Sequence, residues 1–195
     1  MPKIKVTPEE FKDFSKYILD ISGIALDVGK EYLLETRLNP LIGRLGCTSY
    51  FQLLRKAKTD FKKEIENEII DAISTNETYF FRDISPFELL QHKIFPDLID
   101  KRSKNAFSKP TIRLWSAANS TGQEIYSIAM TLIEMGVTPD KYNVKLFGTD
   151  ISDAAIAQAS YGLYNKFEVA RGLDQRRLRS YFEKQNDDRY KVKDN

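Results

Sequence analysis

The pattern of apolar residues changes near Thr111, and this change restricts the possible folds. From there the chain reads as a short strand at 112–115, a loop of small residues at 116–122 and a helix. A second strand at 144–147 and another helix from Ser152 follow. Strands and helices that alternate in this way predict a parallel sheet of the kind that binds nucleotides.

The first hundred residues have helical spacing instead. Thr7, Pro8 and Glu10 form a capping box with proline at the first helical position, and this helix is predicted to end near Gly23. Further helices are predicted at about 30–45, 49–57, 61–73 and from 85 onward. Pro40 is expected to kink or interrupt the first of these.

Two of these helices depend on specific residues. Phe61 is followed by isoleucines at four-residue intervals, ending at Ile73, so it is predicted to start a helix and lie on its apolar face. Ser85 and Glu88 repeat the capping-box spacing, which predicts Ser85 as the cap of a helix that carries Leu89, Leu90 and Ile94.

The predicted fold class is therefore α/β, with an all-helical domain before the first half of a Rossmann-like sheet. We expect a helical domain at 1–73, an inter-domain segment with one helix at 74–109, and a partial α/β domain at 110–195. The polar, basic stretch 101–109 marks the boundary. Residues 190–193 alternate like the start of a strand, so the sequence is expected to stop inside the sheet, whose open edge could pair with a second copy.

Composition excludes several classes of function. The 30 Lys and Arg nearly balance the 28 Asp and Glu, for a net charge of +2, which argues against nucleic acid as a partner. Cys47 and His92 are the single residues of their types, so neither an intramolecular disulfide nor an ordinary zinc site is expected. No run approaches the roughly 18 apolar residues of a membrane span, and the charged start is unlike a signal peptide. These features predict a cytoplasmic protein.

Two features could form a ligand site at the predicted sheet. The loop 116–122 joins a strand to a helix, where small side chains let the backbone approach a ligand; plain packing is an equal alternative. Asp150 ends the second strand, where a carboxylate can accept hydrogen bonds from the ribose hydroxyls of an adenosine, or can cap the helix near Ser152.

A third candidate is the segment 74–83, in which polar side chains alternate with three aromatics. Such a mixture is unusual for a solvated loop. One interpretation is a functional segment; the other is a connector anchored by its aromatics, with Asn76 and Thr78 capping the backbone.

Three stretches together resemble, in the same order, signatures of the CheR family of chemotaxis receptor methyltransferases. They are Thr75–Asp83, Leu114–Glu124 with Tyr126–Met130 after it, and Gly148–Ser152. The helical front, with its turn Ser22-Gly23-Ile24, is also similar to that family's N-terminal domain. The resemblance implies an enzyme that transfers methyl from S-adenosylmethionine to receptor glutamates and releases S-adenosylhomocysteine.

The resemblance also implies roles for particular residues. Those that would bind the cofactor are Asn76, Thr78, Arg82, Ala117, Glu124 and Asp150. Asp150 would hold the ribose, and Arg82 would lie closest to the reacting methyl and act as the catalytic residue. A substrate glutamate with a pKa of about 4.3 is already anionic at neutral pH, so no general base is needed. Alignment and exclusion of water then set the rate.

Lys30, Arg37 and Arg44 recur every seven residues and predict a basic stripe on one helix. The stripe is either a solvated face or, as the resemblance implies, the surface that docks on the acidic methylation region of the receptor's cytoplasmic helical bundle.

The sequence departs from the family in two places. Ile125 stands where the family commonly has proline, and family members continue through further strands that carry an Asn-Leu and a Cys-Arg-Asn segment. Three interpretations are open: a fragment of a full methyltransferase, a short relative that binds cofactor or receptor without catalysis, or a sheet completed by a second copy. A different protein substrate is also compatible with the motifs.

Overall fold

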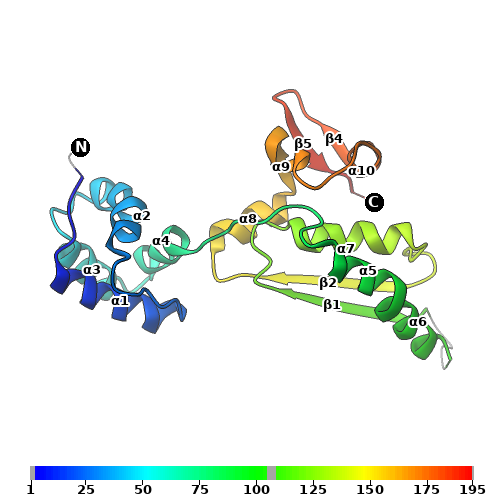
Figure 1. Ribbon diagram of the computed structural model, residues 1–195, viewed down its shortest axis with the longest axis horizontal. Helices are drawn as coiled ribbons and strands as arrows, with labels where there is room; N and C mark the ends of the chain where they lie inside the picture. The colour runs from blue at the N-terminus through cyan, green and yellow to red at the C-terminus, as the bar shows by residue number, and fades with distance from the viewer. Residues whose placement is uncertain (1–2, 105–108, 195) are drawn as a thin grey trace. The chain divides into compact units, whose positions relative to one another are not determined.

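A computed structural model describes residues 3–104 and 109–194, and the chain divides into two compact units (Figure 1). The first runs through Thr75 and includes Ile151–Asp153; the second contains Asn76–Asp150 and the chain from Ala154 onward. Residues 76–104, expected in a separate inter-domain segment, lie in the second unit. Of the predicted boundary at 101–109, residues 105–108 lie outside the described residues.

The first unit is a group of four helices around one apolar core. They are α1 (Pro8–Ser22), α2 (Glu31–Arg44), α3 (Tyr50–Thr59) and α4 (Glu64–Ile73). The predicted capping box is confirmed, because the Thr7 side chain accepts from Glu10 N–H and Glu10 accepts from Thr7 N–H. Gly23 ends α1 in a left-handed conformation, and Pro40 is accommodated within α2.

The prediction for Phe61 is wrong. Its side chain is fully exposed, and α4 begins three residues later, at Glu64. Asp60 causes the delay, since its carboxylate accepts the backbone N–H groups of Lys62 at 3.0 Å and Ile65 at 2.9 Å. These bonds stabilise a turn in place of a further helical turn.

The prediction that Ser85 caps a helix is also wrong. The helix α5 (Ile84–Leu89) has Asp83, in a left-handed conformation at φ 56°, at its cap position. A π-helical turn, η1 (Leu90–Ile94), joins it to α6 (Phe95–Ser103). The π turn shifts the helical register, and Leu89 and Ile94 are exposed.

The predicted β-α-β-α order is confirmed in the second unit. Its elements are β1 (Thr111–Ala117), α7 (Gln123–Glu134), β2 (Asn143–Thr149) and α8 (Asp153–Tyr161). The strands are parallel, in a register that pairs Ala117 with Thr149. The sheet has two strands in the described part of the chain, so pairing of its edge with a second copy stays a prediction.

A second, antiparallel sheet follows that the sequence patterns did not predict. Its strands are β3 (Leu163–Asn165), β4 (Phe182–Lys184) and β5 (Arg189–Val192), with α9 (Lys166–Ala170) and α10 (Gln175–Tyr181) between β3 and β4. The strand predicted at 190–193 thus exists as β5, but it lies between β3 and β4 rather than in the parallel sheet.

The helix α7 lies between the two sheets (Figure 1). Ile128 and Leu132 pack in the core that includes Ile112 of β1, whereas Met130 packs in the core of the antiparallel sheet with Tyr164. This helix therefore connects both cores, and its first turn follows the loop that the motifs single out.

Candidate functional site

The segment 76–83 is anchored by its aromatic side chains, as the connector interpretation expects. Phe80 is fully buried in the antiparallel-sheet core, with its ring 5.1 Å from that of Tyr164 and 5.4 Å from that of Phe182, both edge to face. Asn76 and Thr78, by contrast, are half-buried. The aromatics thus fix a backbone whose polar side chains lie nearer the surface.

The loop after β1 has an unusual backbone. Ala118, Ser120 and Gly122 adopt left-handed conformations, with φ of 57°, 51° and 97°. Such conformations cost free energy for residues other than glycine, and they concentrate at functional sites. Asn119 N–H donates to Thr149 O at 2.9 Å, so the loop is fastened to the end of the neighbouring strand.

Asp150 links this loop to the motif segment. Its Oδ2 accepts the backbone N–H of Ser120 at 2.8 Å, and the Ser120 hydroxyl donates to the Asn76 carbonyl at 2.9 Å. Three stretches far apart in the sequence therefore meet at Ser120. The site is at the carboxyl ends of parallel strands, where open α/β sheets bind ligands.

Two further predicted residues lie at the same strand ends. Ala117 is the last residue of β1 and is exposed. Glu124, in the first turn of α7, is also exposed, and its Oε1 accepts the Ser116 hydroxyl at 2.8 Å. Glu124 is thus held beside the loop by a residue of the strand.

A cleft of about 360 Å³ adjoins the loop, a size within the range of small-molecule sites. Its lining comes from the motif segment, the loop, the start of α7, α8 and α9: Asn76, Glu77, Thr78, Thr121, Gln123, Ala154, Ala155, Gln158 and Glu168. Of the predicted cofactor residues, Asn76 and Thr78 line this cleft. Arg82, Ala117, Glu124 and Asp150 do not.

Arg82 is exposed and folds back along its own segment. Its Nη1 donates to the Glu77 carbonyl at 3.2 Å and lies 3.8 Å from the Glu77 carboxylate. The guanidinium is 5.9 Å from the Tyr79 ring centroid. Because Glu77 stands between Asn76 and Thr78, the Arg82 side chain reaches the polar stretch that adjoins the cleft.

Tyr164 is a site residue that sequence reasoning missed. Its hydroxyl donates to Thr121 O at 2.7 Å, and a Cβ at Gly122 would lie only 2.9 Å from that hydroxyl. Burial raises the pKa of Tyr164, so the hydroxyl remains a donor at all ordinary pH values. Tyr164 lies in a three-residue strand, and nothing near it in the sequence signals the contact.

The three cations of the predicted basic stripe each have a partner. Lys30 precedes α2 and pairs with Asp27 at 2.9 Å, whereas Arg44 pairs with Glu68. Arg37 is half-buried and donates to the backbone carbonyls of Ile73 and Ser74 and to Thr75 Oγ1, the latter two at 2.9 and 3.1 Å. Arg37 therefore binds the carboxyl end of α4.

We expect Arg37→Met to lower the free energy of unfolding by about 1.5–3 kcal/mol, because a charged donor to carbonyls at a helix end would be lost. Urea unfolding followed by circular dichroism measures the change. Arg44→Met, which removes an exposed ion pair, should cost under about 1 kcal/mol. Equal losses in the two variants would contradict the role given to Arg37.

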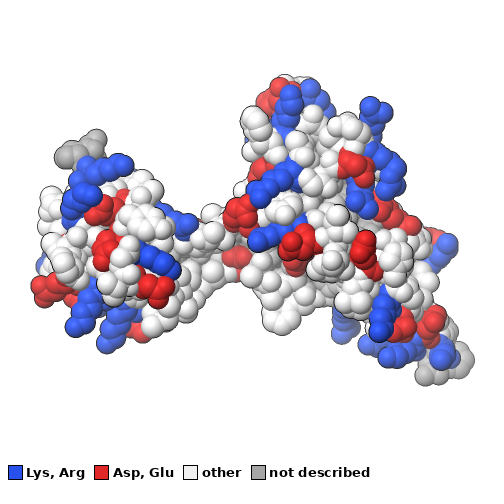
Figure 2. Space-filling view, viewed as in Figure 1, with Lys and Arg blue, Asp and Glu red and all other residues white. Residues whose placement is uncertain are grey.

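The described residues contain no group of three or more His, Cys, Asp or Glu that could hold a metal ion. In the same part of the chain, no helix is long and apolar enough to cross a membrane. Basic and acidic side chains are interspersed over the face of the molecule in Figure 2 rather than separated by sign.

Both units match known protein families. The family described as CheR methyltransferase, all-alpha domain, matches residues 9–74, and the one described as CheR methyltransferase, SAM binding domain, matches residues 76–195. The junction between the two matches coincides with the junction between the compact units.

Curated relatives resemble the chain along its length. It is 38% identical over 200 residues to a chemotaxis protein methyltransferase of Vibrio parahaemolyticus, covering 100% of this chain and 69% of the relative. The corresponding protein of Vibrio anguillarum is 37% identical with the same coverage. That of Borreliella burgdorferi is 35% identical over 98% of this chain and 67% of its own length.

Proposed function

Since the chain belongs to the CheR methyltransferase family, we propose that it transfers methyl groups from S-adenosylmethionine to glutamate side chains of chemoreceptors. One observation supports this above the others: Asp150, Ser120 and Asn76, one from each matching stretch, are joined by hydrogen bonds at the carboxyl ends of the parallel strands. Receptor glutamates in a cytoplasmic helical bundle would place the protein in the cytoplasm.

The residues present fit the cofactor's chemistry. Asp150 would accept hydrogen bonds from the ribose hydroxyls, the left-handed loop after Ala117 brings backbone close to the strand ends, and Glu124 lies exposed in the first turn of α7. Asn76 and Thr78 would contribute polar groups from the cleft. When bound, S-adenosylmethionine supplies an electrophilic methyl carbon on a sulfonium sulfur, and S-adenosylhomocysteine is the product.

The chain's own residues have a modest task in this reaction. The substrate carboxylate is ionised at neutral pH and needs no residue to remove a proton. Arg82 would orient that carboxylate, or the carboxylate of the cofactor, through paired hydrogen bonds. The Arg82 guanidinium already lies 3.8 Å from one carboxylate, that of Glu77. This contact supports the proposal that it would bind the carboxylate of a substrate or cofactor.

Asp150→Asn is expected to weaken S-adenosylhomocysteine binding about tenfold to a hundredfold, because charge-assisted hydrogen bonds contribute roughly 1.5–3 kcal/mol. Isothermal titration calorimetry measures the affinity. Asp140→Asn is the matched control, since Asp140 precedes the opposite end of β2. Unchanged affinity in the Asp150 variant would contradict the proposed ribose contact.

Radiolabelled methyl transfer to receptor, by the same preparation used for calorimetry, tests the activity itself. Cofactor binding together with transfer to receptor glutamates would support the enzyme. Binding without transfer would instead favour a non-catalytic module that binds cofactor or receptor. Transfer to another protein but not to receptor would contradict the proposal that chemoreceptors are the methyl acceptor.

The α2 face remains our proposal for the receptor contact. The Arg44 side chain is 57% exposed and the Lys30 side chain 43% exposed, so both can reach acidic groups on a partner. Arg37 is less available because it binds the end of α4.

We therefore expect Arg44→Glu to weaken receptor binding about fivefold to tenfold at low salt, with a smaller effect at high salt because added ions screen exposed charges. Surface plasmon resonance at two ionic strengths measures this. Lys58→Glu, on α3, provides a control of equal charge change. A loss that does not depend on salt would argue against an electrostatic docking face.

A further inference from the structure

The ion pair of Arg177 and Glu134 lies against the motif segment, and we propose that these two side chains are positioning residues that set the direction of Arg82 by holding its neighbour Phe81. This inference rests on the proposed function, because it concerns the residue expected to orient the reacting carboxylate. Neither Arg177 nor Glu134 belongs to the three matching stretches.

The first hold is on the Phe81 ring. Arg177, in α10, donates from Nε and Nη2 to the two carboxylate oxygens of Glu134, in α7, at 3.0 and 2.9 Å. The Arg177 guanidinium carbon lies 3.9 Å from the centroid of the Phe81 ring. A guanidinium whose plane is fixed by a two-point ion pair is well suited to stack on an aromatic ring.

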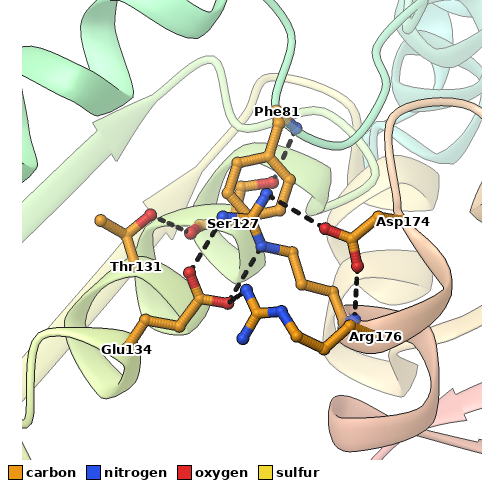
Figure 3. Close-up of polar contacts among 7 residues, drawn as sticks. Phe81, Ser127, Thr131, Glu134, Asp174 and Arg176 are labelled. Atoms are coloured by element: carbon orange, nitrogen blue, oxygen red, sulfur yellow. Dashed lines mark hydrogen bonds and ion pairs between the residues drawn. The ribbon is translucent and has the colours of Figure 1, made fainter.

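The second contact is with the Phe81 backbone. Its N–H donates to Ser127 Oγ at 3.0 Å (Figure 3). The Ser127 hydroxyl in turn donates to the Gln123 carbonyl at 2.6 Å. Ser127 and Glu134 both belong to α7. The helix α7, which begins directly after the loop 116–122, thus binds the Phe81 amide through Ser127 and, through Glu134, orients the α10 arginine that stacks on the Phe81 ring.

Phe81 needs such support because its backbone conformation is unfavourable. Its φ is 52°, and that of Asp83 is 56°, so left-handed residues flank Arg82 on both sides. Bulky residues adopt this region only where the surroundings impose it. The direction in which Arg82 leaves the backbone follows from these two conformations.

The geometry differs from that of an ordinary surface ion pair. The Glu134 and Arg177 side chains are 15% and 24% exposed, and the hydrogen bond from Arg177 lowers the pKa of Glu134. Arg176 also donates to Glu134, at 2.8 Å, but its side chain is 66% exposed. Arg177, unlike Arg176, is placed over the Phe81 ring in the part of the chain that the structure describes. Arg176 is therefore a natural control.

The test compares Arg177→Met with Arg176→Met, using hydrogen exchange of the Phe81 amide, S-adenosylhomocysteine affinity and the kinetics of methyl transfer. In Arg177→Met we expect at least tenfold faster exchange at Phe81 and at least a tenfold lower kcat, with affinity for the product within threefold. Arg176→Met should stay within twofold of the parent in all three. Arg177→Lys keeps the charge but lacks the planar guanidinium, so its kcat and its exchange rate at Phe81 should lie between those of the parent and of Arg177→Met.

Equal exchange and equal kcat in the two methionine variants would overturn the proposal. If Arg177→Met unfolds, Arg177→Lys and Glu134→Gln provide the comparison: full kcat and a protected Phe81 amide in both would also overturn it. A parent protein without cofactor binding or methyl transfer would contradict the proposed function. In that case the exchange measurement would still decide whether Arg177 holds Phe81.

Discussion

Replacing Gly172 with alanine is expected to destabilise the second unit by about 3 kcal/mol or more, a large effect for one methyl group. Gly172 has a φ of +96°, and a Cβ built there would overlap the carbonyl oxygen of Phe80. Phe80 cannot move aside easily, because its ring is fully buried between Tyr164 and Phe182. The clash would separate the motif segment from the antiparallel sheet, so cofactor binding should weaken as well.

Trp115, the one tryptophan of the sequence, lies in β1 and reports on the second unit. Urea unfolding followed by its fluorescence therefore measures the effect. Gly136→Ala is the matched control: Gly136 has a φ of +76° with no atom within 4 Å of an added Cβ, so it should lose only about 1–2 kcal/mol for the left-handed backbone. Equal losses at the two positions would show that the overlap with Phe80 does not decide the result.

The elements that the sequence predicted well are those determined by neighbouring residues. The Thr7 capping box and the β-α-β-α order need only local spacing, and both are confirmed. The start of α4 was mispredicted because an aspartate side chain, Asp60, competes with the helix for backbone N–H groups. Periodicity contains no information about such competition.

The antiparallel sheet escaped prediction for another reason. β3 and β4 have three residues each, too few to show alternation, and β3 pairs with β5 across more than twenty residues. Contacts that depend on this sheet, such as that of Tyr164 with Thr121, could not be predicted from the sequence for the same reason. Long-range packing, rather than local propensity, determines these strands.

The candidate site shows the same division. The resemblance named Asn76 and Asp150, but their connection passes through the Ser120 hydroxyl and backbone, which are not distinctive in the sequence. The sequence analysis assigns Arg37 to a surface stripe, because helical spacing shows which residues share a face of the helix but not what that face contacts. Its contacts with the end of α4 lie 36 and 37 residues away.

Arg82→Ala is expected to lower methyl transfer about a hundredfold while S-adenosylhomocysteine affinity changes less than tenfold. The physical reason is orientation: a guanidinium that aligns the incoming carboxylate by paired hydrogen bonds would contribute roughly 3 kcal/mol to the barrier. Such an interaction acts when both substrates are in place, so kcat should fall more than cofactor binding does. Arg82→Lys keeps a charge but lacks the planar guanidinium. We expect its rate of methyl transfer to exceed that of Arg82→Ala by less than tenfold.

Two measurements separate this role from a loss of structure. Exogenous guanidinium at millimolar concentration should restore part of the activity of Arg82→Ala, because the position is exposed and the missing group can enter from solvent. Arg102→Ala, at an exposed position near the end of α6, should behave as the parent. A fall in cofactor affinity as large as the fall in kcat would assign Arg82 to cofactor binding alone. A parental rate would show that the carboxylate is aligned by other groups.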